Sequence, residues 1–161
     1  MKRSAVYSFC TLLVISVIIS SCAGGAFVRS SGAEFTEVEG REWILLELRK
    51  GRQTVSIDRE SVGMGGGYTI NFFDGRVNGM GVVNLYFGPY TAGPDQTLNI
   101  GDLASTMMAA LFEPQALREH EYFALLSRVS RWNLHRDRLE LHSSGSEGDI
   151  VILIFEKNEN F

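Results

Sequence analysis

Short apolar runs separated by turn residues dominate the chain from about residue 40 onward. The longer runs are Trp43–Leu48, Tyr68–Phe73, Val82–Phe87, Thr97–Ile100 and Ile150–Phe155, with briefer ones at Val55–Ile57, Trp132–Leu134 and Leu139–Leu141. Runs of this length, bounded by Gly, Asn, Asp and Ser, are typical of β-strands. Asp74-Gly75 lies between two runs and predicts a hairpin, because a type I′ turn needs positive φ at both central residues. The run at Ile150–Phe155 predicts a central strand buried on both faces.

One segment has helical periodicity, between Pro114 and about Ser130. Leu117, His120, Leu126 and Val129 recur there at three- and four-residue spacing, which predicts an apolar stripe that packs on a sheet. The polar residues His135–Arg138 separate two short apolar runs and predict a further hairpin. The pattern therefore predicts an α+β fold with one packed helix.

The first residues are organised differently. Lys2 and Arg3 precede an apolar stretch from Thr11 to Ile19, which is followed by Ser20-Ser21-Cys22. A basic start, a short apolar run and small residues are typical of a signal peptide. Ile19-Ser20-Ser21-Cys22 resembles the lipobox of bacterial lipoproteins, where cleavage precedes an acylated cysteine. We expect residues 1–21 to be removed and Cys22 to carry fatty acyl chains that hold the protein to a membrane.

Two other interpretations of this leader stay open. An uncleaved transmembrane anchor needs about 20 apolar residues, and this stretch is shorter and interrupted by Ser16. An ordinary secretory signal could be cut at Ser21-Cys22-Ala23 or at Ala23-Gly24-Gly25. Ala23 lacks the acidic character of an inner-membrane retention signal, which favours the outer membrane. Because Cys10 lies in the leader, Cys22 would be the only cysteine left, and no internal disulfide is expected.

The remaining chain predicts one tethered domain. The residues from Cys22 to about Glu39 are rich in Ala, Gly and Ser at first, so 22–39 is expected to be a flexible tether and 40–157 the domain. Removing Lys2 and Arg3 from 15 basic and 19 acidic side chains leaves 13 basic ones and a net charge of −6. A nucleic-acid partner is therefore not expected, because phosphate binding needs a basic surface.

Several motifs occur in the same order as in a known family. Gly40-Arg41-Glu42-Trp43 resembles the opening G-x-x-W of the META domain, the fold of the HslJ heat-shock family. The segment from Gly75 through Asn84 to Tyr90 is similar to that family's G-x-x-x-G…G-C-N-x-x-x-G-x-Y pattern. Leu98–Ala109 and Glu119–Leu126 also match it. The resemblance spans about residues 40–156 and implies a strongly curved antiparallel sheet or partly closed barrel, with one packed helix.

Two positions depart from the family pattern. Val83 stands where G-C-N has cysteine, and Ala110 stands where relatives have a cysteine after T-x-M-A. Small apolar residues at both positions disfavour a redox role.

Candidate chemistry is sparse. None of the spacings of His120, His135 and His142 matches a zinc motif, so no metal or other cofactor is expected. Ser105 and Thr106 lie near Asp102 but lack a nucleophile elbow, and local hydrogen bonding explains them more simply. The glycines at 63–67 lead into a strand rather than a helix, unlike a phosphate-binding loop. We therefore do not expect an enzyme.

Two kinds of binding protein remain. The family resemblance implies a lipid-anchored module of the cell envelope that binds an envelope protein or acts under envelope stress. The alternative is a small apolar or peptide ligand bound in the mouth of the curved sheet, with walls from Phe72, Phe73, Tyr86 and Tyr90. Asn84, Tyr86 and Tyr90 are the candidate contacts with a ligand or partner, although the amide of Asn84 is expected more often to satisfy backbone groups at a bulge.

Overall fold

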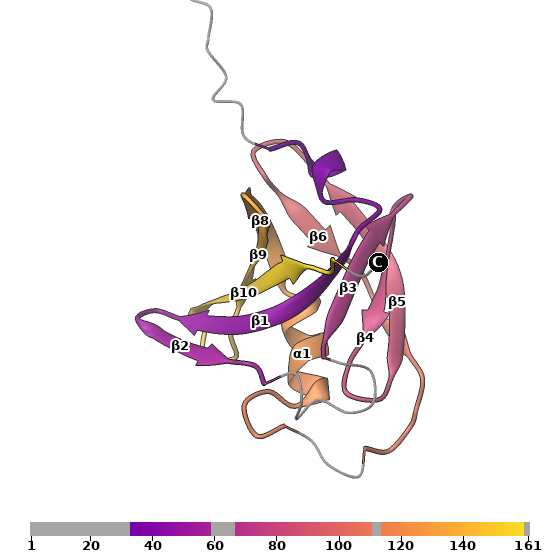
Figure 1. Ribbon diagram of the computed structural model, residues 1–161, viewed down its shortest axis with the longest axis vertical. Helices are drawn as coiled ribbons and strands as arrows, with labels where there is room; N and C mark the ends of the chain where they lie inside the picture. The colour runs from indigo at the N-terminus through magenta and orange to yellow at the C-terminus, as the bar shows by residue number, and fades with distance from the viewer. Residues whose placement is uncertain (1–32, 59–66, 111–113, 160–161) are drawn as a thin grey trace, which may run out of the picture. The chain divides into compact units, whose positions relative to one another are not determined.

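A computed structural model describes residues 33–58, 67–110 and 114–159 of the chain (Figure 1). It contains one 3₁₀ helix, one α-helix and ten strands within these ranges. The elements are η1 (Phe35–Glu37), β1 (Glu42–Lys50), β2 (Gln53–Ser56), β3 (Thr69–Phe73), β4 (Arg76–Met80), β5 (Leu85–Ala92), β6 (Leu98–Ile100), β7 (Ala104–Ser105), α1 (Glu119–Leu126), β8 (Val129–His135), β9 (Arg138–Ser144) and β10 (Ile150–Lys157).

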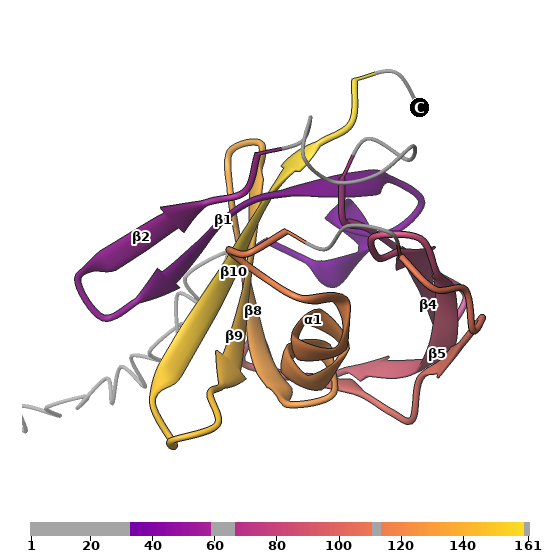
Figure 2. The ribbon, with the colours of Figure 1, turned by 90° about the horizontal axis from the view of Figure 1, so that it is seen from below.

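The strands form a single antiparallel sheet that curls toward a barrel (Figure 2). Its order is β6-β5-β4-β3-β1-β10-β9-β8, with β2 paired to β1 and β7 paired to β5. A bridge between Thr97 and Arg131 joins the two ends of this order, and Trp132 N donates to Gln96 O at 2.9 Å. The fold is therefore α+β, a nearly closed sheet with one helix, as the sequence predicts.

The predicted hairpins and the central strand are confirmed. Asp74 and Gly75 join β3 to β4 with φ of 48° and 72°, the positive values that the turn requires. β8 and β9 are joined through Arg136, which also has positive φ. β10 lies between β1 and β9, so it is central as predicted, but its outer face is buried only in part: Ile154 is 1% exposed, Ile152 is half-buried and Ile150 is 65% exposed.

Each end of the curled sheet is covered by a helix. Figure 1 shows η1 at the upper end and α1 at the lower end. Val38, directly after η1, is fully buried in the core, and its carbonyl oxygen accepts a hydrogen bond from Trp43 Nε1 at 3.0 Å. At the other end, Tyr122 and Leu126 of α1 are fully buried, and Ser143 Oγ of β9 donates to Leu125 O at 2.7 Å.

The helix is shorter than expected. The predicted range from Pro114 to about Ser130 contains only α1, which begins at Glu119 and ends at Leu126. Arg118 has extended backbone, with φ −81° and ψ 153°, and its N–H donates to the Glu121 carboxylate at 2.9 Å. This cap fixes the start of the helix. His120, expected on the apolar stripe, is exposed, and Glu119 is buried instead.

The strand predicted at Val82–Phe87 begins later. β5 starts at Leu85, because Gly81 N donates to Asn84 O at 2.8 Å and closes a turn over residues 81–84. The N–H groups of Val83 and Asn84 donate to the Glu119 side chain rather than to a neighbouring strand.

The domain begins earlier than expected. Residues 33–39, assigned above to the tether, pack on the sheet through Phe35 and Val38. The rest of the expected tether, the leader with Cys22 and most of the glycine cluster lie outside the described residues. Neither described helix is long and apolar enough to cross a membrane.

Candidate functional site

Asn84 holds two segments of the chain together beside α1. Its Nδ2 donates to Glu119 Oε2 at 2.5 Å and to Met108 O at 3.0 Å. Its Oδ1 accepts from Thr106 Oγ1 at 2.8 Å and from Met108 N at 2.7 Å. Two donors and two acceptors complete the capacity of an amide side chain. Asn84 therefore has a structural role: its amide links Glu119 to the segment from Thr106 to Met108, and we call this buried group of hydrogen bonds the clasp. Contact of Asn84 with a ligand stays a prediction, which this geometry does not favour.

Glu119 is the main partner of Asn84, and the sequence did not predict it as a site residue. Its Oε1 accepts from Val83 N at 3.0 Å and from Asn84 N at 2.9 Å, and the residue is 7% exposed. A carboxylate at the first position of α1 is also stabilised by the helix dipole. A Cβ on Gly81 would lie 2.4 Å from Oε1, so a larger residue there would displace the Glu119 carboxylate. The partners lie about 35 residues away in the sequence, where no local pattern could reveal them.

Tyr86 extends this buried polar region across the core. Its Oη donates to Thr69 O at 2.8 Å and lies 3.1 Å from Tyr122 Oη, which donates to the same carbonyl at 3.2 Å. Burial raises the pKa of Tyr86 and of Tyr122, so both phenols keep their protons well above neutral pH. They therefore act as structural donors rather than as acid–base groups.

Tyr90 belongs to an aromatic cluster that fills the upper end of the sheet. The ring of Phe35 lies 5.2 Å from Phe72, 5.4 Å from Tyr90 and 5.0 Å from Trp132, centroid to centroid. The Tyr90 phenol donates to the Glu39 carboxylate; burial, and then this bond, raise its pKa. Trp132 Nε1 has no hydrogen-bond partner among the described residues. The predicted mouth beside Tyr90 is thus occupied by the chain's own Phe35.

The four aromatic residues predicted to form one wall do not lie together. Phe72 and Tyr90 contact each other in the upper cluster, at 5.0 Å between centroids. Phe73 is 65% exposed on the outer face, and Tyr86 packs against Tyr122 and Phe123.

A hollow of about 410 Å³ opens on the outer face of the sheet, where the regular pairing of β3 and β4 ends. Regular pairing of these strands ends at Asn71 and Asn78, and beyond it Met80 N donates to Thr69 Oγ1 at 3.1 Å. The hollow is lined by Glu42, Ile44, Thr69, Asn78, Gly79, Met80, Leu85, Tyr86, Phe87 and Asn158. Of the predicted contact residues, only Tyr86 reaches it.

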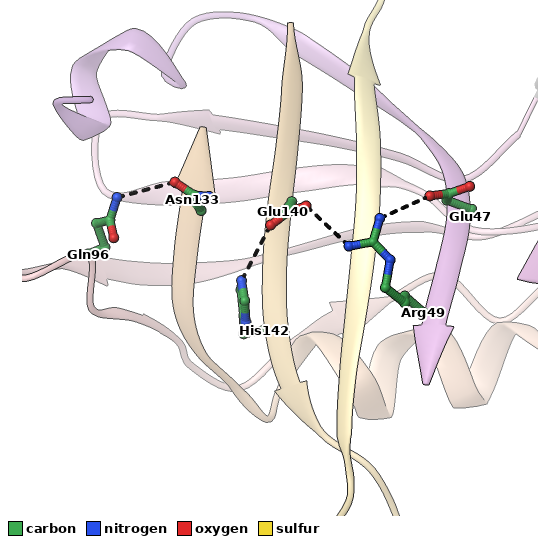
Figure 3. Close-up of polar contacts among 6 residues, drawn as sticks. All are labelled: Glu47, Arg49, Gln96, Asn133, Glu140 and His142. Atoms are coloured by element: carbon green, nitrogen blue, oxygen red, sulfur yellow. Dashed lines mark hydrogen bonds and ion pairs between the residues drawn. The ribbon is translucent and has the colours of Figure 1, made fainter. Parts of the chain in front are cut away.

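The outer face of β1, β10 and β9 has a different surface (Figure 3). Arg49 lies 3.4 Å from the Glu47 carboxylate and 3.6 Å from that of Glu140, and His142 Nε2 lies 3.7 Å from Glu140. These side chains extend over β10, whose Ile154 is buried. These charged groups pair with one another, and together they cover the apolar surface beneath them.

No group of three or more metal-ligating side chains occurs within residues 33–58, 67–110 and 114–159. His142 contacts Glu140, whereas His120 and His135 are exposed on other elements. Val83 and Ala110, which replace the family's cysteines, are both partly buried against the core.

Comparison with known proteins identifies the fold. A protein from Burkholderia xenovorans, solved by NMR, has 19% sequence identity and a TM-score of 0.59 over 77% of this chain and 86% of its own. A DUF4847 family protein from Bacteroides vulgatus has 15% identity and a TM-score of 0.54 over 78% of this chain and 97% of its own. No curated protein sequence matches. The META domain profile matches residues 36–158, nearly all of the described structure, and the chain therefore belongs to the META domain family.

Proposed function

We propose that this protein is a lipid-anchored, non-catalytic binding module of the bacterial cell envelope. Support for the anchor comes from Lys2, Arg3, the apolar stretch Thr11–Ile19 and the cysteine of Ile19-Ser20-Ser21-Cys22. The two or three acyl chains of a mature lipoprotein bind a membrane firmly, whereas one chain binds only marginally. Among the envelope membranes, the outer membrane is favoured because Ala23 follows the cysteine.

The observation that carries the binding role is the outer hollow beside β5. Leu85 and Phe87 are 55% and 50% exposed at its edge. Large apolar side chains gathered in one exposed place are typical of interaction sites. The buried polar residues Glu119, Asn84 and Tyr86 are engaged in hydrogen bonds within the fold and serve stability. Binding is therefore a better explanation of the surface than catalysis.

A comparison of the native chain with Cys22→Ser, each expressed in cells, tests the membrane localisation and the binding role together. Cys10→Ser is the matched control, because Cys10 lies in the expected leader and carries no expected acyl chain. We expect the native protein and Cys10→Ser to partition into detergent, to carry an acylated cysteine by mass spectrometry, and to cross-link to a specific envelope protein. Cys22→Ser should lose the lipid and the membrane fraction. Retention of Cys22→Ser in membranes would rule out the lipid anchor, and absence of any specific cross-link would argue against a stable protein partner.

A further inference from the structure

We propose that the outer hollow binds an extended peptide segment carrying an apolar side chain and, four positions away, a lysine or arginine. This inference rests on the proposed binding role and names its site and ligand class. Two rows of side chains run across the sheet at the hollow, and all of their members except Asn71 line it: Glu42, Asn71, Asn78 and Phe87 in one row, and Ile44, Thr69, Met80 and Leu85 in the other. Each row ends in a half-buried residue on β1, Glu42 or Ile44, and in an exposed apolar residue on β5, Phe87 or Leu85.

The apolar end lies on β5 and the segment paired to it. Leu85 and Phe87 project outward, and their neighbour Met80 is half-buried. Met107 and Met108, 98% and 62% exposed, continue this surface, because Thr106 N donates to Leu85 O at 3.0 Å. Five of the seven exposed large apolar residues in the described chain therefore lie on β3, β5 or this segment: Phe73, Leu85, Phe87, Met107 and Met108. An apolar ligand group gains most by covering this end.

The opposite end is anionic. The Glu42 side chain is half-buried and, among the residues that the structure describes, accepts one hydrogen bond, from Asn158 Nδ2 at 2.5 Å. A carboxylate offers about four acceptor positions, so Glu42 retains capacity for an ammonium or guanidinium group. Arg76 lies at the other end, 5.7 Å above the Phe87 ring, and would repel a cation from there. The two charges together give the bound peptide one orientation.

The spacing follows from the strand register. Glu42 pairs with Asn71, Asn71 with Asn78, and Asn78 with Phe87. Three strand spacings of about 4.8 Å place the two ends of this row roughly 14 Å apart along the sheet. An extended peptide advances about 3.4 Å per residue, and side chains an even number apart share a face. An apolar residue at i and a cation at i+4 therefore match Phe87 and Glu42.

The peptide is expected to lie across the strands rather than to add to an edge. β5 is paired with β4 on one side and with β6 and β7 on the other, so its backbone is already bonded. Midway along the row, the Asn78 side chain makes no hydrogen bond within the described residues. Its amide can both donate to and accept from a peptide backbone.

Isothermal titration calorimetry on the full chain in non-ionic detergent tests this inference. The probe is a capped heptapeptide with Phe at its second position, Lys at its sixth, and Ser, Thr and Gly elsewhere. One control peptide has Glu in place of Lys, and a second has Lys moved to the fifth position, where it faces the other side. We expect binding of the probe to be about tenfold tighter than binding of either control, as expected for one charge-assisted hydrogen bond.

Variants of the protein locate the site. Glu42→Gln and Phe87→Ser should each weaken the affinity for the probe peptide about tenfold or more. Melting temperatures should confirm that both variants are folded. Glu147→Gln and Ile150→Ser are the matched controls, because both residues are exposed and lie away from the hollow, and they should leave affinity unchanged. No binding of the probe, equal affinity for all three peptides, or equal weakening by the control variants would overturn this inference. The proposed anchored binding role would then still be decided by the Cys22→Ser experiment.

Discussion

The two sides of β5 carry different residue types and differ in burial. On its inner side, Asn84 and Tyr86 are almost fully buried, and their polar atoms are bonded to Glu119, Met108 and Thr69. On its outer side, alternate residues Leu85 and Phe87 are half exposed at the edge of the outer hollow. The inner side contributes stability, and the outer side leaves apolar area available for binding.

The outer faces of the sheet sharpen this difference. Over β10, Arg49 contacts Glu47 and Glu140, so the apolar surface there is covered by the protein's own side chains. Over β3 to β5, no comparable ion pair occurs in the described residues, and Phe73, Leu85 and Phe87 stay exposed. The two faces belong to one sheet but have different surfaces, and the exposed apolar area of the second supports the proposed binding role.

The largest expected effect is on the inner side. Glu119→Ala would leave the N–H groups of Val83 and Asn84 without acceptors, so we expect the free energy of unfolding to fall by about 3 kcal/mol. Urea denaturation measures this loss. His120→Ala, at the exposed neighbouring position, should change it by less than about 0.5 kcal/mol. Similar values for the two variants would show that the clasp contributes little.

The aromatic cluster at the upper end should give the next largest effect. Phe35→Ala removes ring contacts with Phe72, Tyr90 and Trp132, and we expect a loss of about 2 kcal/mol, since Phe35 is only partly buried. The fluorescence of Trp132 should also become easier to quench with acrylamide. Phe73→Ala is the control, because Phe73 is 65% exposed. Unchanged quenching in Phe35→Ala would mean that the first helix does not seal this end.

Tyr86→Phe should show a smaller effect that depends on pH. At neutral pH the loss of the hydrogen bond to Thr69 O is expected to cost about 1 kcal/mol. The pKa of Tyr86 is raised in the folded state, so above about pH 10 the unfolded chain releases a proton that the folded chain retains. Native stability then falls by about 1.4 kcal/mol per pH unit for this group, which the variant lacks. The difference in free energy of unfolding between the native chain and Tyr86→Phe, measured by urea denaturation, should therefore narrow from pH 10 to 11. A constant difference would contradict this role of the phenol.

The smallest effect on stability is expected on the outer side. Leu85→Ser should change the free energy of unfolding by less than about 0.5 kcal/mol, because Leu85 is 55% exposed. The same variant should weaken the probe peptide in calorimetry. A large loss of stability would mean that this surface belongs to the core rather than to a binding site.

Local patterns in the sequence predicted much of the fold. Asp74-Gly75 specified its hairpin through backbone geometry, and the apolar run at β10 specified a central strand. The ordered motifs from Gly40 onward identified the family, which the profile match confirms. The predicted start of the helix was wrong because Arg118 adopts an extended conformation, in which its N–H donates to the Glu121 carboxylate. The spacing of the apolar residues does not indicate this cap.

The candidate sites were harder to predict because they depend on contacts between distant residues. Asn84 was predicted as a candidate contact with a structural role as the alternative, and the structure shows its amide bonded within the fold, but its partner Glu119 is 35 residues away. The hollow lies where the regular pairing of β3 and β4 ends, and its lining comes from β1, β3, β4, β5 and the residue after β10. Such convergence is set by the register of the sheet and not by any single segment.

The most direct test of the difference between the two sides of β5 is a ¹H–¹⁵N NMR titration of the full chain with the probe peptide. We predict that amide shifts change at Ile44, Asn78, Met80, Leu85 and Phe87, which line the hollow. Arg49, Glu140 and His142 on the other outer face should not change. Shift changes confined to the charged face, or the absence of any change at saturating peptide, would contradict the account.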